Sequence, residues 1–441
     1  MNSREWVARN LAAALLAGAW EPAALLAGVC DVLGRPTQKS YRLLVQELLD
    51  RVSTVYPPSP AWLVEFFRQS RRFERASARL RRRAQPIPAV LQLPRFSPTG
   101  RFATLTVPGI ATRGDLADWL ELSIEQLAWF ADSRDQHRRT ETPALQHYSY
   151  AFAAKKSGPP RLIESPKPRL KAIQRRILRS ILDQVPVHGC THGFVAGRSC
   201  LSAAGVHAGE ALVVAADLKD FFLTTPLRRV HGLFRSLGYP WAVARLLTGL
   251  CTSAAPPSVF ATLPEGRLPD WLTRKIHEAP HLPQGAPTSP ALANLAAWQL
   301  DVRLHGAAKS FGAAYTRYAD DLVFSGDASF ARRSTSFLAM VAKIARDEGY
   351  VLNRRKTRIM PRSGCQRVTG LVVNDHLNVA RADYDALKAT LHNCCKNGPQ
   401  AENRAGHPDF HAHLEGRVVW VENVNRARGE RLRRMFERIA W

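Results

Sequence analysis

The spacing of hydrophobic residues predicts a helical beginning for this chain. In residues 1–52, leucines and alanines recur at helical intervals, and Glu21-Pro22 has the form of a helix start. Prolines at positions 57, 58 and 60 interrupt the pattern, and residues 61–84 then predict a single basic helix. Thr112–Asp132 predicts two further short helices, whose helix-turn-helix outline is too common among helical pairs to indicate operator binding.

The pattern changes near residue 148, where short β-rich apolar runs begin to alternate with helical ones. The runs span residues 211–217, 314–318, 322–325 and 368–373. This alternation predicts an α+β fold, in which helices cover one face of a small sheet. From about residue 376 onward the sequence is again helical and charged. We therefore expect three parts: a helical basic N-terminal extension over residues 1–140, a mixed part over 141–374 and a helical part over 375–441.

Positive charge dominates the composition and indicates a polyanionic partner. The 441 residues contain 62 Lys plus Arg against 37 Asp plus Glu, a formal net charge of +25. Neutralising phosphates releases counterions and favours binding, so nucleic acid is the expected partner. The arginines of residues 61–84 have few acids to balance them, and they favour contact with a nucleic acid backbone over a merely solvated face.

Cysteine usage and the one long apolar run both indicate a protein of the cytoplasm. The seven cysteines are scattered and form no C-x-x-C pair, which argues against a zinc ribbon or a disulfide framework and fits a reducing compartment. The apolar run at residues 11–29 is interrupted by Glu21 and Pro22, and it predicts a helical hairpin rather than a signal peptide. No other stretch is long enough to span a bilayer, so no membrane partner is expected.

Acidic residues at two places carry the candidate chemistry. Tyr315–Gly326 has Asp320 and Asp321 between two apolar β-runs, which predicts a hairpin with both acids at its tip. Adjacent like charges repel, and a divalent cation removes that repulsion. The apolar run 211–217 ends at Asp217, as expected for a strand buried on both sides. If this strand lies beside the hairpin, the three acids converge and can hold two Mg²⁺ ions about 3.5–4 Å apart, with Mg²⁺ expected because the ligands are hard oxygens.

These acids occur in motifs that resemble those of reverse transcriptases. Asp217–Phe222 and Tyr318–Asp321 are similar to the two acidic palm motifs of that family, and the likeness extends through most of residues 148–374. Further motifs, from the fingers and from the loops around the acids, follow in the family's order: Lys155–Pro166, Leu170–Ile177, His281–Pro290 and Gly349–Thr357. The resemblance implies RNA-directed DNA polymerase (nucleotidyltransferase) activity. It also implies a right-hand polymerase fold, with fingers and palm over residues 141–374 and a thumb over 375–441.

The resemblance also implies roles for individual residues. Asp217, Asp320 and Asp321 would be catalytic, and they would bind two Mg²⁺ ions together with Leu218. Phe222 stands where the family has a ring beneath the sugar, which would exclude a 2′-hydroxyl and select deoxynucleotides. The other nucleotide-binding candidates are Lys155 or Lys156 with Arg161 as a triphosphate grip, the backbone amides of Asp220 and Phe221, Gln284, and Lys356 as a proton donor to pyrophosphate.

Two signatures narrow the resemblance to the retron reverse transcriptases of bacteria. Val368-Thr369-Gly370 matches a retron triplet linked to recognition of the cognate RNA, and Ser202–His207 resembles a second signature, with Ala203 where the family has Asn. His207, Val368, Thr369 and Gly370 are therefore the candidates for binding RNA or primer. The resemblance implies copying of a structured noncoding RNA into single-stranded, 2′–5′ branched DNA. It further implies a part in antiviral defence beside a separate effector protein.

Two other interpretations stay open. A group II intron-derived, diversity-generating or phage-defence reverse transcriptase would carry similar palm motifs, although this sequence contains no cysteine-histidine nuclease module of the kind many intron enzymes carry. A catalytically inactive protein that only binds RNA is the second alternative. The intact Asp217, Asp320 and Asp321 argue against it.

Overall fold

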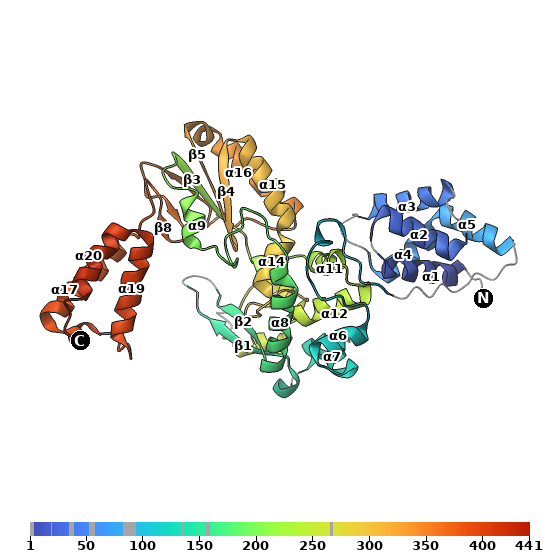
Figure 1. The fold of residues 1–441 in the computed structure, drawn as a ribbon, viewed down its shortest axis with the longest axis horizontal. Helices are drawn as coiled ribbons and strands as arrows, with labels where there is room; N and C mark the ends of the chain where they lie inside the picture. Colours follow the sequence, from blue (N-terminus) through green and yellow to red (C-terminus); the bar gives the residue numbers. More distant parts are fainter. Residues whose placement is uncertain are drawn as a thin grey trace. The chain divides into compact units, whose positions relative to one another are not determined.

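The fold is seen in a computed structural model, drawn in Figure 1. It describes residues 4–18, 20–34, 39–52, 58–82, 94–133, 136–140, 142–155, 159–264 and 268–441. The chain forms two compact units, each built from separate segments: Met1–Pro186 with Phe222–Ala296, and Val187–Phe221 with Ala297–Trp441. The three-part division at residues 140 and 374 stays a prediction.

The first unit begins with a group of helices: α1 (Arg4–Ala17), α2 (Pro22–Leu33), α3 (Lys39–Arg51), α4 (Pro60–Gln69) and α5 (Arg71–Arg82). Their apolar faces enclose one core, which includes Leu11, Leu25 and Phe67. The single basic helix predicted over residues 61–84 is wrong, because Ser70 separates α4 from α5. The Ser70 backbone is extended, and its hydroxyl accepts a hydrogen bond from the Phe73 amide at 3.3 Å, which caps the new helix. Residues 83 and 84 lie outside the described residues.

The rest of the first unit combines short helices with a two-stranded sheet. The helical pair predicted within Thr112–Asp132 is confirmed, and a capping box starts each helix. Strands β1 and β2 pair antiparallel, with Ala153 opposite Arg161. The elements are α6 (Arg113–Leu120), α7 (Ile124–Phe130), β1 (Tyr148–Ala153), β2 (Arg161–Pro166), α8 (Pro168–Ser180), α10 (Phe221–Thr224), α11 (Leu227–Ser236), α12 (Trp241–Cys251), α13 (Trp271–Glu278) and α14 (Ser289–Ala296).

The second unit is built on a four-stranded antiparallel sheet in the order β4-β5-β3-β6. Its strands are β3 (Leu212–Asp217), β4 (Ala313–Tyr318), β5 (Asp321–Gly326) and β6 (Arg358–Pro361). The three strands predicted from the apolar runs at 211–217, 314–318 and 322–325 are thereby confirmed. Helices α15 (Trp298–Ser310) and α16 (Ala328–Asp347) lie along the sheet (Figure 1), and α16 contributes Phe337, which packs edge-on against Phe324 of β5.

The strand predicted over residues 368–373 is instead a tight hairpin. β7 (Arg367–Val368) and β8 (Leu371–Val372) pair antiparallel, and Thr369 and Gly370 form the turn between them. Both turn residues have positive φ, 47° for Thr369 and 87° for Gly370. Two consecutive left-handed residues match the twist of a two-residue hairpin turn, which explains why the apolar run folds back on itself.

The helical C-terminal part is confirmed by α17 (Arg381–Asn397), α18 (Pro399–Glu402), α19 (Phe410–Val424) and α20 (Arg426–Phe436). Leu391, Leu414 and Leu432 of these helices share one core with Val213 and Val323 of the sheet. Among the described residues, no helix has both the length and the apolar character required to cross a membrane.

Candidate active site

Strand register brings the predicted carboxylates to one edge of the sheet. Asp217, the last residue of β3, lies directly opposite Asp321, the first residue of β5. Asp320 belongs to the two-residue turn between β4 and β5, and its carbonyl accepts a hydrogen bond from the Leu218 amide at 2.9 Å. The segment after α16 lies alongside, because the Asn353 amide donates to the Asp217 carbonyl at 2.7 Å. The sheet therefore assembles acids that are about a hundred residues apart in sequence.

The electrostatics of this edge favour a bound cation. The pKa of Asp321 is raised to about 6, chiefly because the surrounding protein displaces water from its carboxylate and also because of the nearby charges of Asp320 and Asp217. Lys356 opposes that shift. Its Nζ lies 2.7 Å from Asp217 Oδ2, and this hydrogen bond raises the pKa of Lys356. Three carboxylates against one ammonium leave excess negative charge with hard oxygen donors, the donor set that suits Mg²⁺.

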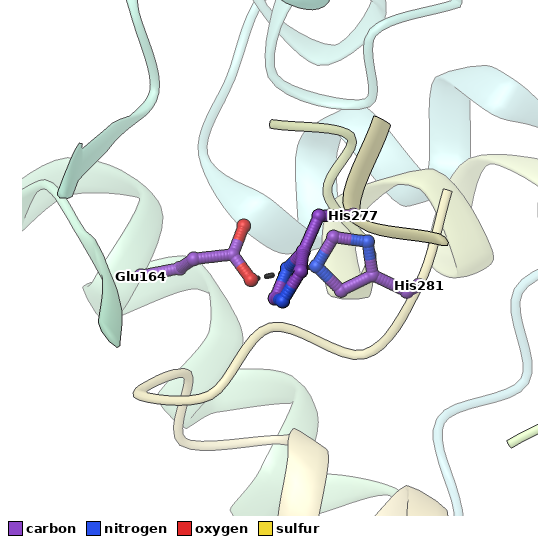
Figure 2. A group of neighbouring side chains, drawn as sticks. All are labelled: Glu164, His277 and His281. Atoms are coloured by element: carbon purple, nitrogen blue, oxygen red, sulfur yellow. Dashed lines mark hydrogen bonds and ion pairs between the residues drawn. The ribbon is translucent and has the colours of Figure 1, made fainter. Parts of the chain in front are cut away.

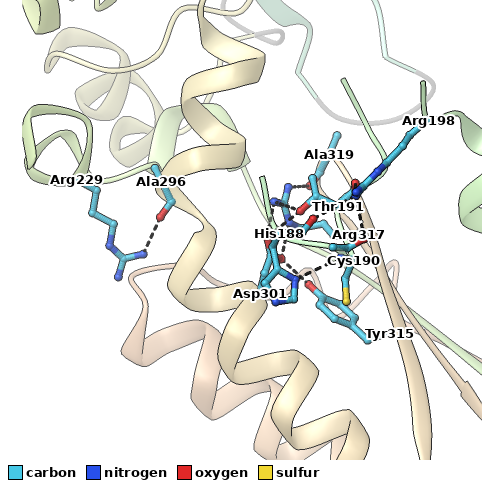
Figure 3. Close-up of polar contacts among 11 residues, drawn as sticks. His188, Cys190, Thr191, Arg198, Arg229, Ala296, Asp301, Tyr315, Arg317 and Ala319 are labelled. Atoms are coloured by element: carbon cyan, nitrogen blue, oxygen red, sulfur yellow. Dashed lines mark hydrogen bonds and ion pairs between the residues drawn. The ribbon is translucent and has the colours of Figure 1, made fainter. Parts of the chain in front are cut away.

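A buried ion pair supports the turn that carries these acids (Figure 3). Arg317 of β4 and Asp301 of α15 are fully buried and meet through two hydrogen bonds, Nε to Oδ1 at 2.8 Å and Nη2 to Oδ2 at 2.6 Å. Tyr315 and Thr191 donate their hydroxyls to the same carboxylate at 2.9 and 3.0 Å. Arg317 Nη1 also donates to the Ala319 carbonyl at 3.1 Å, inside the turn. The guanidinium thus couples the turn to the core.

Comparison with known proteins shows to which family this site belongs. The family described as reverse transcriptase (RNA-dependent DNA polymerase) matches residues 153–373. The chain is 38% identical over 372 residues to the Retron Mx65 reverse transcriptase of Myxococcus xanthus, and the aligned residues cover 83% of this chain and 79% of the relative. It is 31% identical over 317 residues to the Retron Ec86 reverse transcriptase of Escherichia coli, covering 71% of this chain and 87% of the relative.

This chain belongs to the retron reverse transcriptases. The resemblance drawn from the sequence motifs is therefore confirmed, and the protein is an RNA-directed DNA polymerase with the right-hand polymerase fold. Enzymes of the reverse transcriptase family generally use divalent metal ions. The Asp301–Arg317 pair was missed from the sequence. Its signal was an arginine inside a β-run, at a position two residues from Tyr315 and hence on the same strand face.

One predicted RNA-binding residue of this reverse transcriptase is buried in its palm. His207 has no exposed surface, and its ring nitrogens lie 2.7 Å from the hydroxyls of Ser325 and Thr316. Burial lowers the pKa of His207 to about 3, so the ring is neutral at physiological pH. The prediction that His207 contacts RNA is corrected, since the side chain instead ties β4 to β5.

The retron triplet forms the end of β7 and the turn of the small hairpin already described. Val368 is buried in the core that the sheet shares with the C-terminal helices. The Thr369 hydroxyl donates to the Cys200 carbonyl at 3.1 Å, which joins the turn to α9 (Cys200–Gly205). Gly370 is exposed. Of the triplet, the turn residues are therefore the part that a partner molecule can reach.

The remaining predicted residues lie in both units of the reverse transcriptase. Lys155 and Arg161 are exposed and flank the loop between β1 and β2, whereas Lys156 lies outside the described residues. Gln284 accepts a hydrogen bond at its carbonyl from the Glu164 amide at 2.9 Å. Phe222 is half-buried in α10.

Asp220 and Phe221 follow the end of β3 in the second unit. Asp220 has a φ of 51°, which turns the backbone sharply after the strand. The Phe221 ring is buried, and the Arg317 guanidinium carbon lies 5.5 Å from its centroid. The ring of Phe221 is thus part of the support beneath the turn of the two aspartates.

Proposed function

We propose that this enzyme copies a cognate structured noncoding RNA into single-stranded DNA by two-metal nucleotidyl transfer at Asp217, Asp320 and Asp321. The observation that carries the proposal is the register of β3 and β5, which sets Asp217 opposite Asp321 with Asp320 in the adjoining turn. The raised pKa of Asp321 is further support, because the neighbouring charges of Asp320 and Asp217 disfavour its ionised form and a shared cation would relieve that repulsion.

The three carboxylates, with the carbonyl of Leu218, would hold two Mg²⁺ ions. When bound, such ions activate the attacking hydroxyl and stabilise charge on the leaving pyrophosphate. Lys356 Nζ lies 2.7 Å from Asp217 Oδ2, beside the proposed metal ligands. From this position the Lys356 ammonium would give a proton to the leaving pyrophosphate.

Residues of the fingers would bind the incoming deoxynucleoside triphosphate. Lys155 and Arg161 are exposed cations on either side of one hairpin loop, and with Lys156 they would grip the phosphates. The backbone amides of Asp220 and Phe221 are likewise proposed to bind phosphates. The Phe222 ring would lie beneath the sugar and exclude a 2′-hydroxyl, and Gln284 would contact the nucleotide or the template.

The RNA and the product would be bound by the C-terminal part. Arg426, Arg431 and Arg434 of α20 are exposed, and a row of exposed arginines suits the phosphates of a template–product duplex. The turn containing Thr369 and Gly370 would contact the cognate RNA. We further propose priming from a 2′-hydroxyl, which leaves a 2′–5′ branched product, and a part in antiviral defence with a separate effector, as the retron resemblance implies.

Primer extension on an RNA template with Mg²⁺ tests the proposed site. Asp320→Ala should abolish DNA synthesis while leaving RNA affinity nearly unchanged, because the substitution removes a metal ligand and no predicted RNA contact. Asp385→Ala is the matched control, since this exposed aspartate pairs with Arg381 across one helical turn and should keep full synthesis. Synthesis by the Asp320→Ala enzyme at the wild-type rate would exclude the proposed metal site.

Sequencing of nucleic acid that copurifies with the protein tests the substrate. The proposal expects one structured RNA joined to single-stranded DNA through a 2′–5′ branch. A linear DNA product with random RNA sequences would contradict the cognate RNA and leave the polymerase assignment intact.

A further inference from the structure

A second group of possible metal ligands lies in the first unit, within the part assigned to the fingers. Glu164 of β2, His277 at the end of α13 and His281 in the following loop have 0%, 5% and 1% of their surface exposed. Their donor atoms all lie within 4.8 Å of one another. Figure 2 shows the carboxylate and both imidazole rings pointing toward one another. Among the described residues, the carboxylate oxygens of Asp217, Asp320 and Asp321 do not form a group that meets this distance.

Hydrogen bonds orient His281 as they orient a metal ligand. Its Nδ1 lies 2.8 Å from the Ala279 carbonyl, to which the ring must donate because a carbonyl only accepts. The second nitrogen, Nε2, faces Glu164 Oε2 at 2.6 Å. Metal-binding histidines commonly donate one N–H to a backbone carbonyl in this way, which fixes the ring and leaves the other nitrogen free to coordinate.

Two atoms of the cluster have no hydrogen-bond partner within the described part of the chain. They are Glu164 Oε1 and His277 Nδ1, and both are buried. A buried polar atom without a partner costs about 1–3 kcal/mol, so two such atoms in one buried cluster need an explanation. A cation bound among the three side chains would satisfy the carboxylate and take up the available imidazole nitrogens.

We propose that Glu164, His277 and His281 bind one Zn²⁺ ion, with a fourth position left for water. Two imidazoles and one carboxylate are typical zinc ligands, whereas Mg²⁺ prefers sites made of oxygen alone. The site is buried, and its ligands come from two segments that also meet through the Glu164 amide and the Gln284 carbonyl. The ion joins β2 to the loop that carries Gln284, and it does so independently of the polymerase chemistry.

The close approach of these segments explains why a link at this position matters. A Cβ atom added to Gly285 would lie 2.7 Å from the Glu164 carbonyl oxygen, and Gly285 has a φ of 140° that other residues rarely adopt. The loop therefore lies directly against β2. Ser253 and His281 exchange two backbone hydrogen bonds, of 3.0 and 2.9 Å, which hold the other end of the loop.

The sequence His277-Glu278-Ala-Pro-His281 matches the His-Glu-x-x-His motif of zinc peptidases, but the geometry here excludes peptidase activity. Those enzymes carry both histidines on one helix, with the intervening glutamate as general base. Here α13 ends at Glu278, and Pro280 prevents its continuation. Glu278 pairs with Lys275 at 2.5 Å, on the solvent side of the helix, and its carboxylate is not among the clustered ligands. The site is therefore assigned a structural role.

Zinc content of the full-length protein tests the proposal. Protein stripped with a chelator is incubated with Zn²⁺, desalted and analysed by mass spectrometry of the metal, and Co²⁺ serves as a spectroscopic probe of nitrogen ligation. We expect one zinc per chain. Glu164→Gln and His277→Gln should each lower zinc affinity at least tenfold, since each removes a ligand. Glu278→Gln is the matched control and should bind zinc as the wild type does.

Two results would overturn the zinc site. A stripped wild-type protein that keeps its circular dichroism spectrum but takes up no zinc would show that the cluster is only a buried His281–Glu164 ion pair. Equal uptake by the wild type and Glu164→Gln would place the zinc elsewhere. If Glu164→Gln does not fold, the wild-type stoichiometry still decides between these outcomes. Asp320→Ala should keep its zinc while losing synthesis, so that failure of the zinc site and failure of the polymerase site are distinguishable.

Discussion

Replacing Asp301 by asparagine should loosen the hairpin that carries the catalytic aspartates. In the wild type, Asp301 and Arg317 are both fully buried and share two hydrogen bonds of 2.8 and 2.6 Å. The same carboxylate accepts the hydroxyls of Tyr315 and Thr191. Asparagine keeps one oxygen that can accept a hydrogen bond. Its NH₂ group replaces the second carboxylate oxygen and would face the same hydrogen-bond donors, with which it cannot pair. The variant therefore leaves a buried guanidinium without a counter-charge.

The size of the effect follows from that burial. Removing one partner of a buried ion pair costs about 3–5 kcal/mol, because the remaining charge stays in a medium that solvates it poorly. The asparagine oxygen offsets part of the loss, so we expect a value near the lower end, about 3 kcal/mol, or roughly a hundredfold in an opening equilibrium. Arg317 also donates to Ala319, so the loss should reach the turn that contains Asp320.

Hydrogen exchange measured by mass spectrometry is the suitable assay, because it reports local opening of β4 and β5 in a protein of two units. Peptides from residues 313–326 should exchange roughly a hundredfold faster in Asp301→Asn. Asp347→Asn is the matched control. Its partner Arg303 and Asp347 itself are each more than a third exposed, and such a pair contributes about 0–1 kcal/mol. Exchange in Asp301→Asn within threefold of the wild type would refute the role assigned to the buried pair.

Three further predictions concern the palm, the sugar and the small hairpin. DNA synthesis at limiting Mg²⁺ should fall as the pH drops through about 6, because protonated Asp321 cannot bind a cation. Lys356→Met should move this fall to higher pH, because it removes the charge that lowers the pKa of Asp321, and an unchanged pH profile would contradict this. Phe222→Ala should raise ribonucleotide incorporation relative to deoxynucleotides by about tenfold or more in competition assays, and unchanged selectivity would leave the ring a packing role. Gly370→Ala should lower the midpoint of thermal unfolding, because alanine at a φ of 87° costs about 1 kcal/mol. Gly364→Ala is the control and should leave the midpoint unchanged, because its Cβ would meet Pro361 at an ordinary 3.5 Å, and equal midpoints for the two variants would exclude strain at the turn.

The sequence alone determined the elements that depend on neighbouring residues. The apolar runs before Asp217 and around Asp320-Asp321 predicted three strands and placed the acids at their ends, since extended backbone and apolar composition are local properties of a strand. Where local signals conflicted, the prediction was wrong. The basic helix of residues 61–84 divides at Ser70, and the run 368–373 bends at Thr369-Gly370, because the capping of one residue and the turn conformation of the other two outweigh the surrounding periodicity.

Which distant side chains meet depends on how the chain packs in three dimensions. His207 reaches Ser325 across 118 positions, and Glu164 reaches His281 across 117. Asp301 and Arg317 are nearer in sequence, but they meet because α15 lies along β4. Each of these contacts joins polar groups that burial would otherwise leave without partners, and the partner is chosen by the register of the sheet and the packing of helices. The sequence shows that a residue is polar, whereas the fold determines how far that residue is removed from water and which charged groups lie beside it.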